Sequence, residues 1–415
     1  MARKNRRNDG AGGDIASLVT QVSPAMRTFR RQMHQTPEVM FEEHQTAALI
    51  RGQLDRLGVA YLPAPSEAPT ATIACIGDPQ LPCIALRADI DALPITEATG
   101  AAYASTIPGR MHACGHDGHT AALLGAAAVF KKIERSLDVC VKLIFQPAEE
   151  GGGGAERLVR AGVMDGRLGP KPLAIFGLHG WPGIPLGKVA TRPGPLLAST
   201  DNFSATFVGK GTHGAFPHLG RDPIVATCAA VLSLQQVVSR DTNPVESVVV
   251  TVGRITGGTA VNIIPPTATI EGTARTLTHQ TRQAVQEAMR RRLAGVAMTH
   301  DVQLQFVWSE GYPPTVNTPE MADYVREVAK DTFGADAFVP AAAPSMGGED
   351  FAYYLEKVPG CFTLIGLCPE GSTDCPGLHN PSFDFNDDAL PVAIQLLVSL
   401  ATQWTQRSGA SPAKR

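Results

Sequence analysis

The 415-residue chain has little net charge of either sign and no long apolar run. Its 36 basic and 39 acidic residues leave a formal net charge of −3, so it lacks the basic stripe with which proteins bind nucleic acid or anionic membranes. No segment approaches the roughly 20 apolar residues of a membrane span. No apolar stretch follows the basic residues near its start, as one would in a secretory leader. We therefore expect a cytoplasmic protein that binds neither nucleic acid nor a membrane.

Cysteine is scarce as well. Eight cysteines in a chain of this length are too few for a disulfide scaffold. Three of them, Cys361, Cys368 and Cys375, are too loosely spaced to resemble a zinc ribbon. The cysteines therefore predict neither a disulfide framework nor a structural zinc site.

Length and composition predict more than one domain. A chain of 415 residues exceeds what one hydrophobic core normally supports, and 44% apolar with 18% charged residues is an ordinary globular composition. Helical periodicity covers residues 14–35, 42–57 and about 118–133. Short apolar runs typical of buried parallel strands occupy 70–76, 83–88, 139–145 and 173–178. This alternation predicts a mixed, mostly parallel α/β sheet.

The middle of the chain has a different order of elements. From about 196 to 308 it reads strand, helix, strand, strand, helix, strand, which is the ferredoxin-like pattern. Candidate metal ligands occur on both sides of this block, whereas the block itself carries only isolated histidines. We therefore predict a discontinuous catalytic domain, residues 14–192 and 312–415, with an inserted ferredoxin-like α+β domain, residues 193–311, after a disordered basic tail, residues 1–13.

The segment from His112 to His119, HACGHDGH, concentrates metal-binding side chains on one glycine-containing turn. Cys114 and His116 are separated by one residue, so a thiolate and an imidazole can converge on one divalent cation. A sulfur ligand disfavours Mg²⁺ and Ca²⁺ and leaves Zn²⁺, Mn²⁺, Co²⁺ and Ni²⁺ as candidates. A single histidine of the octet would be interpreted as part of a solvated helix start, so the metal hypothesis depends on partners elsewhere.

Such partners follow the apolar strands. Ligand-type residues come directly after three of them: Asp89 and Asp91, Glu149 and Glu150, and His179. Ligands of parallel sheets gather beyond the carboxyl ends of the strands, so we expect these residues at one edge. His379, in LHNPSF, is a further candidate. Asp89 or Asp91 is expected either to orient a metal ligand or only to cap a turn.

Nine segments, in order along the chain, resemble the motifs of the M20 metallopeptidases. They are RADIDALP (87–94), HACGHDGH (112–119), QPAEEGGGGA (146–155), GLHG (177–180), GTHGAFPH (211–218), VNIIP (261–265), GTART (272–276), GGEDF (347–351) and LHNPSF (378–383). The chain is similar in particular to the amidohydrolase branch, which contains hippurate hydrolases, N-acyl-amino-acid aminoacylases and plant auxin-conjugate hydrolases.

This resemblance implies two divalent ions per subunit and a glutamate general base. The ligands would be Cys114, His116, Glu150, His179 and His379, and the base would be Glu149. Cys114 matches the bridging position, where many M20 peptidases have an aspartate.

The resemblance also assigns roles to the inserted domain. It implies a homodimer formed through this domain, in which His213 stabilises the developing oxyanion in the partner's site. Arg275 would bind the carboxylate of the substrate, since a guanidinium suits a carboxylate bidentately. Asn262, in the VNIIP segment, would contact the substrate as well.

The expected activity is metal-dependent hydrolysis of N-acyl amino acids, such as hippurate or N-acetyl amino acids. Coordination can lower the pKa of water from 15.7 to about 7, after which Glu149 takes the proton and passes it to the leaving amine. One alternative is dipeptidase-like or aminopeptidase-like M20 activity. Another is a metal-free thiol hydrolase with Cys114 as nucleophile and His116 or His119 as base. With 6% aromatic residues, benzoyl, acetyl, indolyl and longer acyl groups all stay open.

Overall fold

The computed structural model describes residues 15–372 and 375–407. The predicted basic tail therefore lies outside the described residues. The chain divides into two compact units. The first comprises the chain up to Gly194, Asn317–Ala342 and the chain from Tyr353 onward, and the second comprises Pro195–Val316 and Ala343–Ala352. None of the helices in the described ranges combines the length and apolarity needed to span a bilayer.

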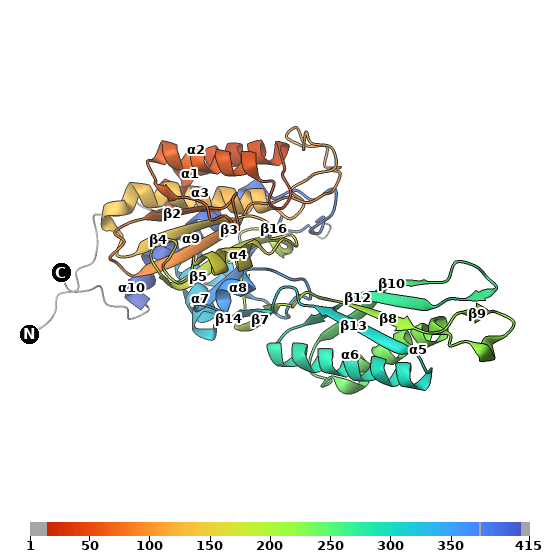
Figure 1. The fold of residues 1–415 in the computed structure, drawn as a ribbon. Coiled ribbons are helices and arrows are strands. Elements are labelled where there is room, and N and C mark those ends of the chain that lie inside the picture. The colour runs from red at the N-terminus through yellow and green to blue at the C-terminus, as the bar shows by residue number, and fades with distance from the viewer. Residues whose placement is uncertain (1–14, 373–374, 408–415) are drawn as a thin grey trace, which may run out of the picture. The chain divides into compact units, whose positions relative to one another are not determined.

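The first unit is built on an eight-stranded sheet with the order β1-β2-β4-β3-β5-β16-β6-β15 (Figure 1). Its strands are β1 (Tyr61–Leu62), β2 (Thr72–Ile76), β3 (Cys83–Asp89), β4 (Cys140–Gln146), β5 (Pro172–Pro185), β6 (Val189–Thr191), β15 (Phe338–Pro340) and β16 (Gly360–Cys368). The central strands β4, β3, β5 and β16 are parallel neighbours. This confirms the mixed, mostly parallel sheet.

One strand direction was predicted wrongly. The run 70–76 forms β2, but β2 pairs with β4 in the antiparallel sense. A continuous apolar run reports burial on both faces of a sheet and contains no information on the direction of the neighbouring strand. β2 is nearly fully buried, so its composition matches that of its parallel neighbours.

Helices cover this sheet. They are α1 (Ile15–Gln35), α2 (His44–Leu57), α3 (His116–Ile133), α4 (Gly154–Ala161), α7 (Pro319–Phe333), α8 (Ala352–Leu355), α9 (Leu390–Thr402) and α10 (Trp404–Arg407), with short helical turns at Glu134–Ser136, Ala335–Ala337 and Asp387–Ala389. α1 buries residues three and four apart, such as Val22, Met26 and Phe29, because that spacing lines one helix face. α2 stops at Gly58, which adopts the left-handed conformation. α1, α3 and α9 pack against one another, and their apolar side chains join the core of the sheet.

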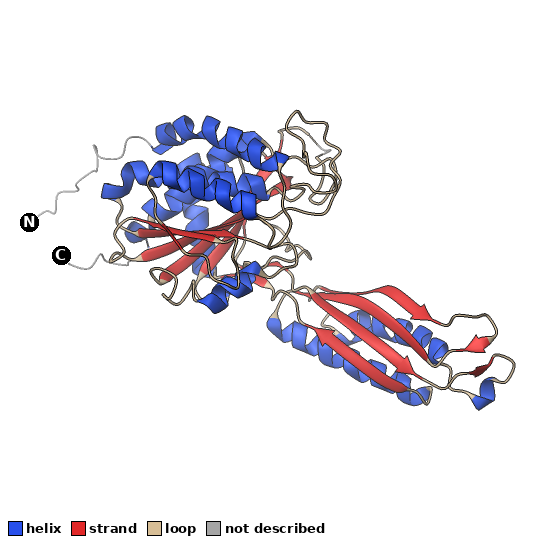
Figure 2. Ribbon diagram, turned by 45° about the horizontal axis from the view of Figure 1, so that its top comes forward, coloured by secondary structure: helices blue, strands red, loops and turns tan. Residues whose placement is uncertain are grey.

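The second unit is a four-stranded antiparallel sheet with helices α5 and α6 on one face (Figure 2). Its main elements are β8 (Asp201–Val208), α5 (Pro223–Gln236), a π-helical turn (Val237–Asp241), β10 (Val248–Gly257), β12 (Thr267–Thr276), α6 (His279–Thr299) and β13 (Gln303–Ser309). The strand order β10-β12-β8-β13 and the alternation of strands and helices confirm the ferredoxin-like fold.

Smaller elements complete the second unit. The strand β9 (Thr212–His213) pairs with β11 (Ile263–Ile264), β7 (Gly194–Leu197) pairs with β14 (Thr315–Asn317), and a 3₁₀ turn spans Pro217–Leu219. The core between sheet and helices contains Phe207, Leu234, Ile270, Met289 and Leu293, each fully buried.

Candidate metal centre

The HACGHDGH segment forms a tight turn followed by the start of α3. Gly115 precedes the helix with φ of 84°, a left-handed conformation that favours glycine. A Cβ at Gly118 would lie 2.5 Å from the ring of Phe385, so only glycine permits this close approach. The turn thereby directs Cys114 and His116 to the carboxyl edge of the sheet, where both side chains are buried.

Side chains from three distant segments meet Cys114. Its Sγ lies 3.3 Å from Nε2 of His179. Five groups of donor atoms among the described residues lie within 4.8 Å of one another, and three of them surround Cys114 and His116: Cys114, His116 and His179; Cys114, Glu150 and His379; and His116, Glu149 and Glu150. The first two groups share only Cys114, which is the arrangement expected when one thiolate bridges two cations.

One nitrogen of each buried candidate ligand histidine is already hydrogen bonded. His116 donates through Nδ1 to Asp91 Oδ1 at 3.2 Å, and His179 donates through Nδ1 to the carbonyl of Gly180 at 2.7 Å. In the neutral form of each ring the proton is therefore on Nδ1, and Nε2 is the nitrogen that could bind a cation. His116 Nε2 is buried without a hydrogen-bond partner, an unfavourable arrangement that a coordinated cation would relieve. The residues present thus fit a two-ion site.

Glu149 and Glu150 sit in a glycine-rich turn between β4 and α4. Ala148, just before them, adopts a φ of 56°, and Gly151 and Gly153 also have left-handed backbones. A Cβ at Gly154 would stand 1.7 Å from the carbonyl oxygen of Pro147, so the turn closes only with glycine there.

Asp91 is the residue that ties this turn to the HACGHDGH segment. Its Oδ2 accepts the backbone N–H of Glu150 at 2.9 Å while its Oδ1 accepts from His116. Asp91 thus contacts the candidate ligand His116, as its expected role in orienting a ligand requires. Asp89 makes its hydrogen bond to a different histidine, His119, at 2.7 Å.

His179 lies inside a strand, which corrects the expectation that it directly follows one. β5 runs on to Pro185, beyond the apolar run that ends at 178. The strand continues because β16 pairs with it past His179, Leu364 standing opposite His179. His179 still reaches the same edge, since Gly177 stands opposite Arg87, two residues before Asp89 on the parallel neighbour β3.

His379 enters the site from the segment after β16. Its φ is 63°, and its backbone N–H donates to the carbonyl of Ala113 at 2.8 Å. Its Nε2 lies 3.2 Å from Oε1 of Glu150. At its upstream end the same segment is fastened by a disulfide between Cys368 and Cys375, a single bridge that the sequence did not predict.

The cluster has a strongly negative electrostatic environment. Burial alone would lower the pKa of His116, but Asp89, Asp91 and Glu150 together raise it to about 10. Burial, with Glu150 and Glu149 adding to it, raises the pKa of Cys114 well above its usual range. A thiol in this setting stays protonated unless cations are present, which argues against Cys114 as a metal-free nucleophile.

The other two histidines of the octet have no metal-binding role predicted from the sequence, and His119 is expected there only as an alternative base of a thiol hydrolase. His119 donates through Nδ1 to Asp89 and accepts the N–H of Gly180 at Nε2, at 2.7 Å each, so both ring nitrogens are committed. It therefore packs beside His179 as a support and not as a ligand. His112 is buried, and burial lowers its pKa to about 3. Only the three-residue spacing of His116 and His119 on one helix face signals the role of His119.

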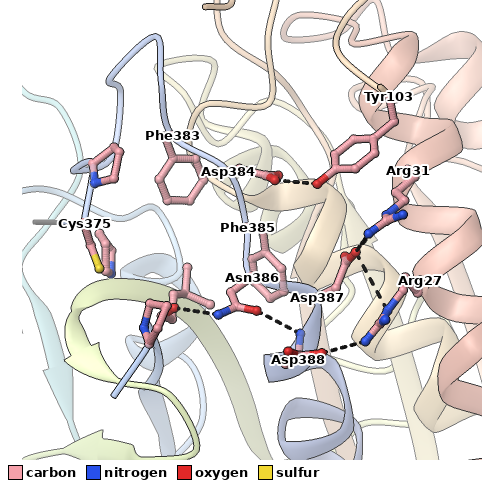
Figure 3. Close-up of a pocket in the computed structure, with 14 residues that line it drawn as sticks. Arg27, Arg31, Tyr103, Cys375, Phe383, Asp384, Phe385, Asn386, Asp387 and Asp388 are labelled. Atoms are coloured by element: carbon pink, nitrogen blue, oxygen red, sulfur yellow. Dashed lines mark hydrogen bonds and ion pairs between the residues drawn. The ribbon is translucent and has the colours of Figure 1, made fainter. Parts of the chain in front are cut away.

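The wall behind the turn is formed by the segment that follows His379. This segment lines a pocket of about 380 Å³, in which Tyr103 donates to Asp384 and Arg31 donates to Asp387 (Figure 3). Phe383 and Phe385 separate this pocket from Gly115, Gly118 and Gly180.

The remaining predicted residues lie in the second unit. His213 and Asn262 are neighbours there, since Gly214 N–H donates to the carbonyl of Asn262 at 2.8 Å, and both residues are exposed. His213 Nδ1 accepts the N–H of Ala215 at 3.0 Å, so the neutral ring carries its proton on Nε2. Arg275 lies at the C-terminal end of β12 and is half-buried. It contacts only carbonyl and hydroxyl oxygens, and among the described residues it forms no ion pair with a carboxylate.

Comparison with known proteins assigns the family. The family model described as Peptidase family M20/M25/M40 matches residues 85–403. The chain belongs to this family.

Two curated relatives and one solved structure are similar over nearly the whole chain. IAA-amino acid hydrolase ILR1-like 2 of Arabidopsis thaliana is 42% identical over 93% of this chain and 86% of its own length. N-acetyl-L-cysteine deacetylase of Bacillus subtilis is 40% identical, covering 94% and 92%. A Bacillus subtilis crystal structure described as a dinuclear metal binding peptidase of the M20 family is 37% identical, with a TM-score of 0.80 and coverage of 92% and 98%.

These matches define the general class of the protein. It is an M20 amidohydrolase that acts on amide bonds, and its fold is that of the M20 peptidases. The solved M20 relative is described as dinuclear, and the described residues of this chain include several groups of candidate ligands.

Proposed function

We propose that this M20 enzyme hydrolyses the amide bond of N-acyl amino acids with two divalent cations and Glu149 as general base. The observation that carries the proposal is the pair of ligand groups that share Cys114, with Glu149 beside them. Cys114, His116 and His179 would hold one ion, and Cys114, Glu150 and His379 the other. Zn²⁺, Mn²⁺, Co²⁺ and Ni²⁺ all accept this donor set.

Bound ions would supply Lewis-acid charge and a water that ionises near neutral pH. Glu149, buried at the edge of the cluster, would be the residue that accepts a proton and delivers it to the leaving nitrogen. Glu150 cannot fill the same role, because its carboxylate faces His379 and its N–H is held by Asp91. The two adjacent glutamates thus divide proton transfer from metal binding.

The relatives support the substrate class. The Arabidopsis relative is named for hydrolysis of indoleacetic acid conjugates of amino acids, and the Bacillus relative for deacetylation of N-acetyl-L-cysteine. Both names describe an acyl group joined to the nitrogen of an amino acid. We extend that class to this chain and assign no particular acyl group.

Metal removal and a substrate panel test the proposal. The enzyme is treated with a chelator and reconstituted separately with Zn²⁺, Mn²⁺, Co²⁺ or Ni²⁺, and amine release is measured from N-acetyl, N-benzoyl and N-indolylacetyl amino acids and from dipeptides. We expect activity to disappear on chelation and to return with metal on the N-acyl substrates. Activity that is indifferent to chelation would support the thiol hydrolase, and preference for dipeptides would support the peptidase alternative.

We further propose that Arg275 binds the substrate carboxylate and that Asn262 contributes a polar contact to the substrate. The nearby carboxylate of Asp201 pairs with Arg282, with contacts as short as 2.6 Å. The guanidinium of Arg275 can therefore bind another anion. Burial lowers the pKa of Arg275, as expected for a cation kept out of water without a carboxylate of its own.

Arg275→Ala should raise KM strongly for N-acyl amino acids and weakly for the corresponding amides. Arg254→Ala is the matched control, because Arg254 is an exposed arginine on the neighbouring strand β10 that pairs with Glu271. Equal effects of Arg275→Ala on acids and amides would remove the assignment, and the same KM change in the control would show a general charge effect.

We also propose a homodimer in which His213 completes the partner's site. β10 is an edge strand of ten residues in the second unit, and unpaired edges of this length invite pairing with another chain. Exposed apolar side chains of the same unit include Val225, Leu232, Ile255 and Val261. The Nε2 proton of the exposed His213 suits donation to a developing oxyanion.

Mixing two inactive variants tests the arrangement. His213→Ala and Glu149→Ala are combined under conditions of subunit exchange, so that in each mixed dimer one site unites an intact Glu149 with an intact partner His213. Random exchange predicts recovery to about a quarter of wild-type activity in a two-fold dimer. Absence of recovery in demonstrated mixed dimers would refute the role of His213 across the interface.

A further inference from the structure

A buried carboxyl group outside the ligand cluster contacts the turn that carries Glu149. Glu43, at the start of α2, is fully buried. Its Oε1 accepts the backbone N–H of Ala148 at 2.9 Å, and its Oε2 accepts the hydroxyl proton of Thr70 at 2.7 Å. Glu43 is 105 residues away from Ala148 in sequence, so this contact exists only in the folded chain.

Capping of α2 does not explain the burial of Glu43. The Glu43 side chain makes no capping hydrogen bond to its own helix. The N–H groups at the start of α2 are satisfied instead by Glu38, whose carboxylate accepts from Gln45 at 3.1 Å and from Thr46 at 2.8 Å. The carboxyl group of Glu43 is therefore free to serve another segment.

That segment is strained and tightly closed. Ala148 is a non-glycine residue with φ of 56°, a conformation that persists only where surrounding contacts enforce it. Its carbonyl accepts the N–H of Gly154 at 3.1 Å, and a Cβ at Gly152 would lie 2.6 Å from the Ala148 methyl group. With the Ala148 N–H held by Glu43 and the Glu150 N–H held by Asp91, Glu149 is fixed from both sides.

We propose that Glu43 is a positioning residue for the reaction: by holding the Ala148 N–H, it fixes the direction in which Glu149 presents its carboxylate. This inference rests on the proposed function of Glu149 as the proton carrier. Burial raises the pKa of Glu43 to about 7, with Asp91 adding to the rise, yet a neutral or an ionised carboxyl oxygen can accept the Ala148 N–H. The positioning therefore does not depend on the charge of Glu43.

Substitutions at Glu43 separate this role from bulk stability. Glu43→Gln keeps an oxygen for Ala148 and a polar group for Thr70, so we expect kcat within about threefold of wild type. Glu43→Met keeps the length of the side chain but has no oxygen acceptor. We expect its kcat to fall by about tenfold to 100-fold, because small misplacements of a reacting group have effects of this size. Its KM and metal content should stay near wild type. Thr70→Val removes only the hydroxyl that orients Glu43 and should give an intermediate loss; it also keeps the test decisive if Glu43→Met folds poorly.

Glu38→Met is the matched control. Glu38 is another buried glutamate of the same segment, and within the described part of the chain its carboxylate accepts hydrogen bonds from the start of α2. This variant should lower the melting temperature and leave kcat unchanged. An equal kcat loss in Glu38→Met and Glu43→Met would show a structural effect and overturn the proposal.

Two further measurements distinguish failure of this inference from failure of the proposed function. In a double-mutant cycle, Glu43→Met should add nothing to the kcat loss of Glu149→Gln if both act on one step, whereas an additive loss refutes the coupling. Hydrogen exchange of the Ala148 amide in the metal-free protein should accelerate in Glu43→Met and not in Glu38→Met. If the wild type has no amidohydrolase activity but the Ala148 amide exchanges faster in Glu43→Met, only the proposed function fails. If the wild type is active and the Ala148 amide stays protected in Glu43→Met, only the Glu43 inference fails.

Discussion

Arg30 provides the most informative test of how the fold supports the metal-binding turn. Its side chain is fully buried in α1, and its Nη1 contacts Asp117 at 3.2 Å and Asp384 at 2.9 Å, while Nε lies 2.6 Å from Asp387. Asp117 follows His116 directly, so this one cation joins α1, the HACGHDGH turn and the segment after His379. Arg30→Met would leave Asp117 and Asp387 buried without their shared positive charge.

The expected loss of unfolding free energy is about 3 kcal/mol, the lower end of the 3–5 kcal/mol typical of a broken buried pair. The lower end applies because His34 still donates to Asp117 at 2.8 Å. A loss of this size corresponds to a fall in melting temperature of about 5 °C for a unit as long as the first one. Arg31→Met is the matched control, since Arg31 pairs with the same Asp387 but is 43% exposed; its loss should be below about 1 kcal/mol.

The assay is thermal and denaturant unfolding of both variants between pH 4 and pH 8. The difference between wild type and Arg30→Met should be largest at neutral pH and shrink toward pH 4. Arg30 is among the groups that hold the pKa of Asp117 below its usual range against the effect of burial, so without Arg30 this carboxylate takes up a proton as the pH falls and the stranded charge disappears. A loss under about 1 kcal/mol at pH 7, or a loss independent of pH, would refute this reasoning.

Three further changes have defined outcomes. Gly154→Ala would place a Cβ 1.7 Å from the Pro147 carbonyl oxygen and open the turn that carries Glu149 and Glu150. Metal content measured by elemental analysis should therefore fall well below the wild-type level, and full metal content would contradict this prediction. Tyr324→Phe removes a buried hydroxyl that donates to the Leu400 carbonyl at 2.7 Å and should lower the unfolding free energy by about 1 kcal/mol in denaturant titration, whereas no change would mean that water replaces the bond. Burial raises the pKa of Glu43 from 4.5 to about 7, so the folded metal-free chain binds this proton more tightly than the unfolded chain does. The stability of the wild type should therefore fall by about 3 kcal/mol relative to that of Glu43→Gln as the pH rises from 4.5 to about 7. Parallel stability curves for the two proteins would disprove this titration.

Local sequence patterns were sufficient for most of the fold. The period of apolar residues predicted α1, α2 and α3, and the element order of the middle block predicted a ferredoxin-like unit, because both depend on burial of neighbouring side chains. The direction of β2 could not be predicted in the same way. It depends on which strand β2 pairs with, and that partner, β4, lies more than 60 residues further along the chain.

The residues of the candidate site also fall into those that local sequence patterns predicted and those that only the folded chain reveals. Cys114, His116 and the Glu149–Glu150 pair stand out because their residue types and spacing are unusual for a structural turn, and the structure brings them together with His179 and His379. Glu43 and His119 carry no comparable signal. A glutamate at a helix start is ordinarily a solvated cap, and only the folded chain shows that Glu43 faces Ala148 instead. The disulfide of Cys368 similarly depends on where β16 ends.

Turnover and metal content of Glu149→Gln, measured on the same sample, test the central claim most directly. Glutamine retains the shape of Glu149 but cannot carry a proton, so we predict bound metal near the wild-type level with turnover of N-acyl amino acids reduced by about 100-fold or more. Cys114→Ala, in contrast, should lose metal, because Cys114 belongs to both ligand groups. If Glu149→Gln kept most of its activity with its metal in place, the assignment of Glu149 as general base would be wrong.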